Sequence, residues 1–147
     1  MNQLPVSVLP AEEGFLALPE AHLASFENAR VVIQQIPYEH TSSYIAGSDK
    51  GPEAIVSASH FVEFYDEELD SETYRYVGIA TLAPTDFTNT VDAAAVEKIR
   101  AQTSALLNEG KFVVSLGAEH TVSLGFVQAH LEKYPNLSVL QIDAHSD

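Results

Sequence analysis

Short apolar runs rich in β-branched residues alternate along the chain with longer segments of helical spacing. The runs occur at residues 31–36, 76–80, 112–116 and 137–142. Each has the length of a buried strand, and strands that alternate with helices build a parallel sheet covered on both faces. The sequence therefore predicts a three-layer αβα fold with a parallel sheet.

Amphipathic helices are predicted between these runs, at about residues 52–65, 92–110 and 122–134. Pro52 suits the first turn of a helix, Asp92 is expected to cap the second helix, and Gly110 is expected to end it. The third helix is expected to turn three apolar side chains inward, those of Leu124, Val127 and Leu131.

The net charge and the absence of cysteine limit which functional groups and which partners the chain can use. The 147 residues contain no cysteine, and 21 acidic side chains against 7 basic ones give a formal net charge of −14. Without thiols the chemistry has to come from His, Asp, Glu and hydroxyl groups. Dispersed basic residues form no patch for nucleic acid, and no run approaches the about 20 apolar residues that span a membrane. We expect a cytoplasmic protein with cationic small molecules as partners and with neither nucleic-acid nor membrane partners.

Polar clusters follow the last two apolar runs. Residues 117–120, Gly-Ala-Glu-His, follow the first of them, and residues 143–147, Asp-Ala-His-Ser-Asp, follow the second. The carboxyl ends of parallel strands meet at one edge of a sheet, so these clusters are expected to lie together. In an extended segment Asp143, His145 and Asp147 point the same way.

Two carboxylates and an imidazole that meet at one point suit Mn, Fe or Zn, and they can build a two-metal centre. In the alternative interpretation Asp143 caps the following segment and His145 is a surface residue. Spacing alone leaves both interpretations open.

The same residues resemble the first two signatures of the ureohydrolase family, which includes arginases and agmatinases. The matching stretches are 116–125 and 142–147, and residues 36–55 resemble the family's first-strand loop and the helix after it. The resemblance spans about residues 31–147. It implies an arginase-like fold and a pair of manganese ions that serve the hydrolysis of a guanidino group.

The resemblance also implies roles for single residues. His120, Asp143 and Asp147 would bind one manganese, and Asp143 and His145 would bind the other, so that Asp143 bridges the pair. The nucleophile would be a hydroxide held by the metals, and no side chain is assigned as a catalyst. Four residues of the loop after the first strand are candidates for the rim of the substrate pocket: Tyr38, His40, Ser43 and Tyr44.

The favoured reaction is that of agmatine and water to putrescine and urea, by a cytoplasmic homo-oligomer when the protein is full length. Arginine and guanidinobutyrate are the other guanidino substrates considered. A non-catalytic α/β binding or interaction domain is the alternative from a different class. In that case Asp143, His145 and Asp147 would be ordinary loop residues.

The chain departs from the family pattern in two respects. Ala118 stands where the family usually has glycine, and Glu119 stands where it often has aspartate; a positive φ at Ala118 would strain the backbone. The second departure is that nothing here matches the family's later Ser-x-Asp-x-Asp motif, which supplies two more metal ligands. We therefore expect residues 1–147 to be the N-terminal half of one ureohydrolase domain, with an incomplete site and a truncated sheet.

Overall fold

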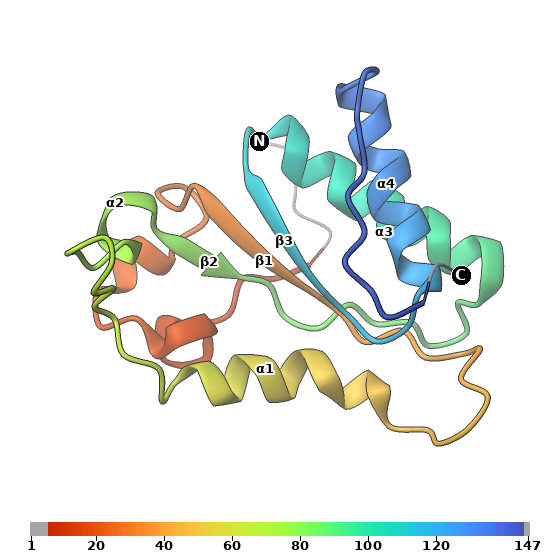
Figure 1. Cartoon of the computed structure of the whole chain (residues 1–147), viewed down its shortest axis with the longest axis horizontal. Coiled ribbons are helices and arrows are strands. Elements are labelled where there is room, and N and C mark those ends of the chain that lie inside the picture. Colours follow the sequence, from red (N-terminus) through yellow and green to blue (C-terminus); the bar gives the residue numbers. More distant parts are fainter. Residues whose placement is uncertain (1–5, 146–147) are drawn as a thin grey trace.

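Three parallel strands lie between layers of helix in the computed structural model, which describes residues 6–145 (Figure 1). The strands are β1 (Val31–Ile36), β2 (Ile79–Thr81) and β3 (Phe112–Gly117), in the order β2-β1-β3. β1 pairs with β3 along its whole length. The predicted α/β fold with a parallel sheet is confirmed.

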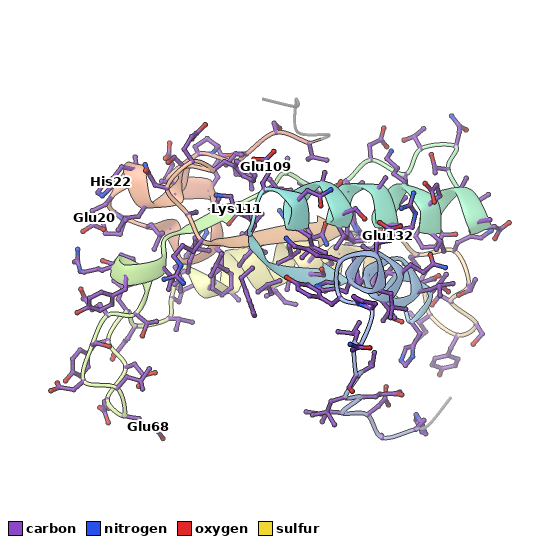
Figure 2. The ribbon with its side chains drawn as sticks, turned by 90° about the horizontal axis from the view of Figure 1, so that it is seen from above. Glu20, His22, Glu68, Glu109, Lys111 and Glu132 are labelled. Carbon is purple, nitrogen blue, oxygen red and sulfur yellow. The ribbon has the colours of Figure 1, made fainter. Side chains whose placement is uncertain are left out.

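Helices cover both faces of this sheet. The α-helices are α1 (Gly51–Ser59), α2 (Tyr74–Val77), α3 (Asp92–Asn108) and α4 (Thr121–Lys133). Short 3-10 helices precede β1 and α1: η1 (Ala11–Glu13), η2 (Phe15–Ala17), η3 (Ala21–Ala24) and η4 (Ser48–Lys50). Figure 2 shows α1 on one side of the sheet and α3 on the other. No helix among residues 6–145 has both the length and the apolar character needed to cross a membrane.

The N-terminus of α3 is capped differently from the prediction. Asp92 is the first residue of the helix, and no side chain of the preceding residue, Val91, caps it. Instead the hydroxyl of Tyr38 accepts a hydrogen bond from the backbone N–H of Asp92 at 2.9 Å. The C-terminal end of α3 is as predicted, because Gly110 follows the helix with a φ of +74°.

The second predicted strand begins later than expected. Residues 76 and 77 belong to α2, and the strand starts at Ile79. Gly78 separates the two with a φ of +61°, and a Cβ at this position would lie 2.9 Å from the carbonyl oxygen of Leu23. A conformation that favours glycine therefore turns the chain at this point from helix into strand.

The predicted strand at residues 137–142 is wrong for this structure. The segment forms no strand, and the side chains of Leu140 and Ile142 are 85% and 92% exposed. Two residues of α4 that were expected to face inward, Leu124 and Leu131, are also exposed, and Val127 is half-buried. The physical reason is that α4 packs on α3 through its other face, while β3 forms an edge of the three-stranded sheet in the described part of the chain.

A buried polar network connects β1, β3 and α3. Gln34 donates from Nε2 to the hydroxyls of Thr103 and Ser115, both at 2.8 Å. Gln102 donates to the side-chain oxygen of Gln34 at 3.1 Å and accepts a hydrogen bond from Thr85 at 3.0 Å. Because a buried polar group is costly unless it is paired, this network fixes how α3 lies on the sheet.

Gly125 marks a close approach between α4 and α3. A Cβ at this position would lie 2.7 Å from Cγ2 of Ile99 and 2.9 Å from the carbonyl oxygen of Val96. We expect Gly125→Ala to lower the free energy of unfolding by about 1–3 kcal/mol, because the two helices have to separate. The measurement is urea denaturation, with Gly51→Ala as the matched control.

The control substitution is also in a helix, but a Cβ at Gly51 would meet nothing within 4 Å. Gly51→Ala should therefore leave stability unchanged or raise it slightly, since alanine favours a helix. Equal stabilities of the two variants would contradict the close contact at Gly125.

Candidate metal centre

His120 and Asp143 meet beyond the carboxyl end of β3. His120 comes directly before α4, and Asp143 lies in the exposed segment after that helix. The Nε2 atom of His120 is 3.4 Å from Oδ2 of Asp143. Two ligands predicted from separate motifs thus lie side by side, although the strand expected to carry Asp143 is not formed.

The carboxylate of Asp143 is held by its own segment. Its Oδ1 atom accepts the backbone N–H of His145 at 2.9 Å. This hydrogen bond is the largest cause of a pKa below the ordinary value; burial opposes it, and the side chain of Gln141 and the charge of His120 add to it. Asp143 is therefore an anion near neutral pH, as a metal ligand requires.

Of the remaining predicted ligands, only His145 lies within the described residues, and it does not complete a metal-binding group with His120 and Asp143. The side chain of His145 is exposed, and Asp147 lies outside the described residues. Among residues 6–145, no three or more side chains of His, Asp or Glu lie close enough together to hold a metal ion. The imidazole of His120 and the carboxylate of Asp143 are donor groups of a kind that suits manganese.

The backbone before His120 is free of the strain considered from the sequence. Ala118 is not among the residues with a positive φ. Gly117 is the position that needs a glycine, because a Cβ there would lie 2.6 Å from Cγ2 of Val122. Alanine at position 118 therefore leaves the approach to His120 undistorted.

The candidate rim residues differ in their surroundings. Tyr38 is buried beneath the loop, where its ring packs against Phe87 and its hydroxyl caps α3. His40, Ser43 and Tyr44 are exposed on the loop itself. The Nε2 atom of His40 lies 3.6 Å from a carboxylate oxygen at the start of α3. Three of the four residues can therefore meet a ligand from solvent.

The far end of this loop is closed by Glu39, a residue that the sequence did not single out. Its Oε2 atom accepts the backbone N–H groups of Gly47 at 2.8 Å and Asp49 at 3.4 Å. The hydrogen bond from Gly47 is the largest cause of a pKa lowered to about 2; burial opposes it, and Asp49, Ser42 and Ser48 add to it. An ionised Glu39 thus keeps the loop compact.

Glu119 holds the near end of the loop. Its Oε2 atom accepts the backbone N–H groups of His40 at 2.8 Å and Thr41 at 2.9 Å. Burial raises the pKa of Glu119, but hydrogen bonds from these two N–H groups and from threonine hydroxyls lower it by more. The residue before the predicted ligand His120 therefore touches the loop that carries the candidate rim.

Known proteins share the part of the sequence that contains these residues. Residues 29–147 match the sequence profile of the Arginase family. The chain belongs to the arginase family. An N(1)-aminopropylagmatine ureohydrolase of Synechocystis is 39% identical over 130 residues, which cover 85% of this chain and 42% of that protein. An agmatinase of Bacillus anthracis is 38% identical over 125 residues, which cover 84% of this chain and 42% of that protein.

The fold of this arginase-family chain agrees with a solved structure. A candidate agmatinase from Clostridium difficile superposes with a TM-score of 0.75 at 21% identity, over 82% of this chain and 44% of that one. The chain spans less than half the length of the curated relatives it matches. The matched region includes β1, β3 and both polar clusters, so the resemblance seen in the sequence is confirmed.

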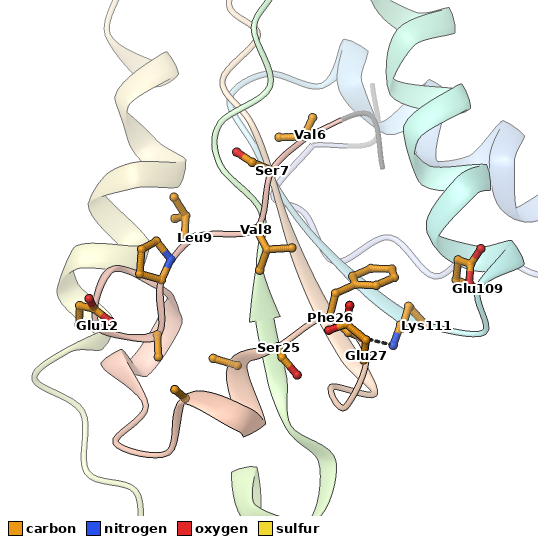
Figure 3. Close-up of a pocket in the computed structure, with 14 residues that line it drawn as sticks. Val6, Ser7, Val8, Leu9, Glu12, Ser25, Phe26, Glu27, Glu109 and Lys111 are labelled. Atoms are coloured by element: carbon orange, nitrogen blue, oxygen red, sulfur yellow. Dashed lines mark hydrogen bonds between the residues drawn. The ribbon is translucent and has the colours of Figure 1, made fainter. Parts of the chain in front are cut away.

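This arginase-family chain also has a hollow at the other end of β3. Its volume is about 1070 Å³, and its walls are formed by residues 6–12, Ala21, residues 24–27, Glu109 and Lys111 (Figure 3). The ammonium group of Lys111 donates to the carbonyl oxygens of Phe26 and Ala29. The predicted metal ligands that the structure describes, His120, Asp143 and His145, do not line this hollow, which is separate from the candidate metal centre.

Proposed function

We propose that the full-length protein is a manganese-dependent ureohydrolase that converts agmatine and water into putrescine and urea. The observation that carries the proposal is the distance of 3.4 Å between Nε2 of His120 and Oδ2 of Asp143. These atoms belong to two motifs that are separate in the sequence. A non-catalytic domain would have no need to bring an imidazole and an ionised carboxylate together at the carboxyl end of a strand.

Four residues would hold the metal ions: His120, Asp143, His145 and Asp147. Asp143 would be shared between the two ions. A manganese pair supplies an activated water for attack on a guanidino carbon and stabilises the negative charge that develops. The chain's own part is to place the donors: the start of α4 places His120, and the backbone N–H of His145 orients Asp143.

The loop after β1 would meet the substrate. His40, Ser43 and Tyr44 are exposed on it, and it is hydrogen-bonded to the residue next to His120. A guanidinium substrate is cationic, and the chain carries a formal net charge of −14, so its approach is not opposed. N(1)-aminopropylagmatine is the second candidate substrate, because the Synechocystis relative is named for it.

The rest of the site would come from the part of the protein beyond this chain. The described residues bring two of the four predicted ligands together, and the matched relatives are longer than this chain. We therefore propose that these residues form the N-terminal part of one ureohydrolase domain.

The experiment is urea release by the full-length protein after loading with manganese. Agmatine, N(1)-aminopropylagmatine, arginine and guanidinobutyrate are compared at equal concentrations, and agmatine is expected to give the largest kcat/KM. A larger value for another of these substrates would replace agmatine but keep the family reaction. If none of the four releases urea from protein that contains manganese, the non-catalytic alternative is favoured.

A further inference from the structure

Glu119 connects two segments that lie far apart in the sequence. One oxygen of its carboxylate accepts two consecutive backbone N–H groups, those of His40 and Thr41, which lie 79 and 78 positions away. Hydrogen bonds to an ionised acceptor are about twice as strong as those between neutral groups. The carboxylate therefore fixes the start of the loop to the residue before His120.

The other carboxylate that binds this loop contacts its far end, and not the part near His120. Glu39 holds the loop at its far end, through Gly47 and Asp49. Between the two carboxylates, residues 40–46 are exposed. The hydrogen bonds of Glu119 join His40 and Thr41 to the segment after β3, so without Glu119 the position of this part of the loop relative to His120 would vary.

Only one of the two carboxylate oxygens of Glu119 accepts the N–H groups of the loop. Oε1 of Glu119 is buried and accepts no hydrogen bond from the described residues. Both loop contacts thus depend on a single acceptor atom. A glutamine can place its carbonyl oxygen at the position of Oε2, but it loses the negative charge and buries an amide NH₂ group where Oε1 lies.

We propose that Glu119 is a positioning residue, which holds the loop after β1 at a fixed distance from the metal ligand His120 so that exposed loop side chains meet the substrate. The inference rests on the proposed ureohydrolase function. It assigns to Glu119 an effect on substrate binding rather than on metal binding, because both backbone N–H groups that its carboxylate accepts belong to the loop, whereas the start of α4 places His120.

The test uses the full-length protein with Glu119→Ala, Glu119→Gln and the control Glu97→Gln. Glu97 is an exposed glutamate on α3 that pairs with Arg100, away from the loop. Three quantities are measured: hydrogen exchange at the amides of His40 and Thr41, manganese per protomer, and the separate values of kcat and KM for agmatine.

In Glu119→Ala, amide exchange at His40 and Thr41 should become about tenfold faster or more, and KM should rise by about tenfold. Manganese content and kcat should stay close to the wild-type values. Glu119→Gln should lie between wild type and the alanine variant, since it retains one acceptor, and Glu97→Gln should behave like wild type.

Unchanged exchange at both amides in Glu119→Ala would overturn the inference, whatever happens to the activity. Faster exchange with an unchanged KM would also overturn it, because the loop would then have no part in substrate binding. Loss of manganese from the folded Glu119→Gln variant would overturn it in favour of a direct role at the metals. If wild-type protein releases no urea, the proposed function fails, while the exchange data still decide whether Glu119 holds the loop.

Discussion

Asp143→Ala in the full-length protein should remove both manganese ions and lower urea release by more than about 100-fold. A loss of about 100-fold is the largest expected for a residue that only supports a metal ligand, and Asp143 is proposed to be a ligand itself. Asp143 is the residue proposed to bind both ions. Its carboxylate already lies 3.4 Å from His120, and the hydrogen bond from the N–H of His145 lowers its pKa. Alanine leaves neither ion with its shared donor. Elemental analysis and urea release measure the two effects.

The matched control for this variant is Asp70→Ala. Asp70 is an exposed aspartate whose carboxylate accepts a hydrogen bond from Tyr65, in the acidic segment that carries Glu68 (Figure 2). It should retain both ions and full activity. Two ions per protomer in Asp143→Ala would refute the bridging role, even if turnover falls.

Local sequence patterns were sufficient to predict the centre of the fold. β1 and β3 lie where the β-branched runs predicted, because β-branched residues favour a pleated, at least half-buried strand. α3 follows its helical spacing and ends before Gly110. The segment at residues 137–142 is also a short apolar run, but it has no strand partner among the described residues. An apolar run therefore predicts that a segment can form a strand, but not whether a partner strand is present.

In the candidate site, too, some features could be predicted from the sequence and others could not. His120 and Asp143 were predictable because motif spacing places both after apolar runs at one edge of the sheet. The contacts of Tyr38, Glu39 and Glu119 were not, since each side chain binds backbone N–H groups that any residue type supplies. Such partners leave no pattern in the sequence, and tertiary structure alone reveals them.

The 147-residue chain by itself should release no urea and bind fewer than two manganese ions per chain, whereas the full-length protein should do both. In the described residues two predicted ligands meet, and no group of three or more exists. The apolar side chains of the segment that carries Asp143 are also left uncovered, as the exposure of Val139, Leu140 and Ile142 shows. Elemental analysis and urea release on both forms provide the comparison.

The missing strand pairing of residues 137–142 can be tested separately, by hydrogen exchange at the backbone amides of this segment. β3 is at the edge of the described sheet, and exposed apolar residues on α4 and on this segment need a cover. In the full-length protein we expect the segment to pair as a fourth strand and its amides to exchange slowly; in the chain alone they should exchange fast. Amides of β1, paired on both sides, are the internal control and should be slow in both forms. Turnover by the chain alone with two bound ions would show instead that these residues contain a complete site.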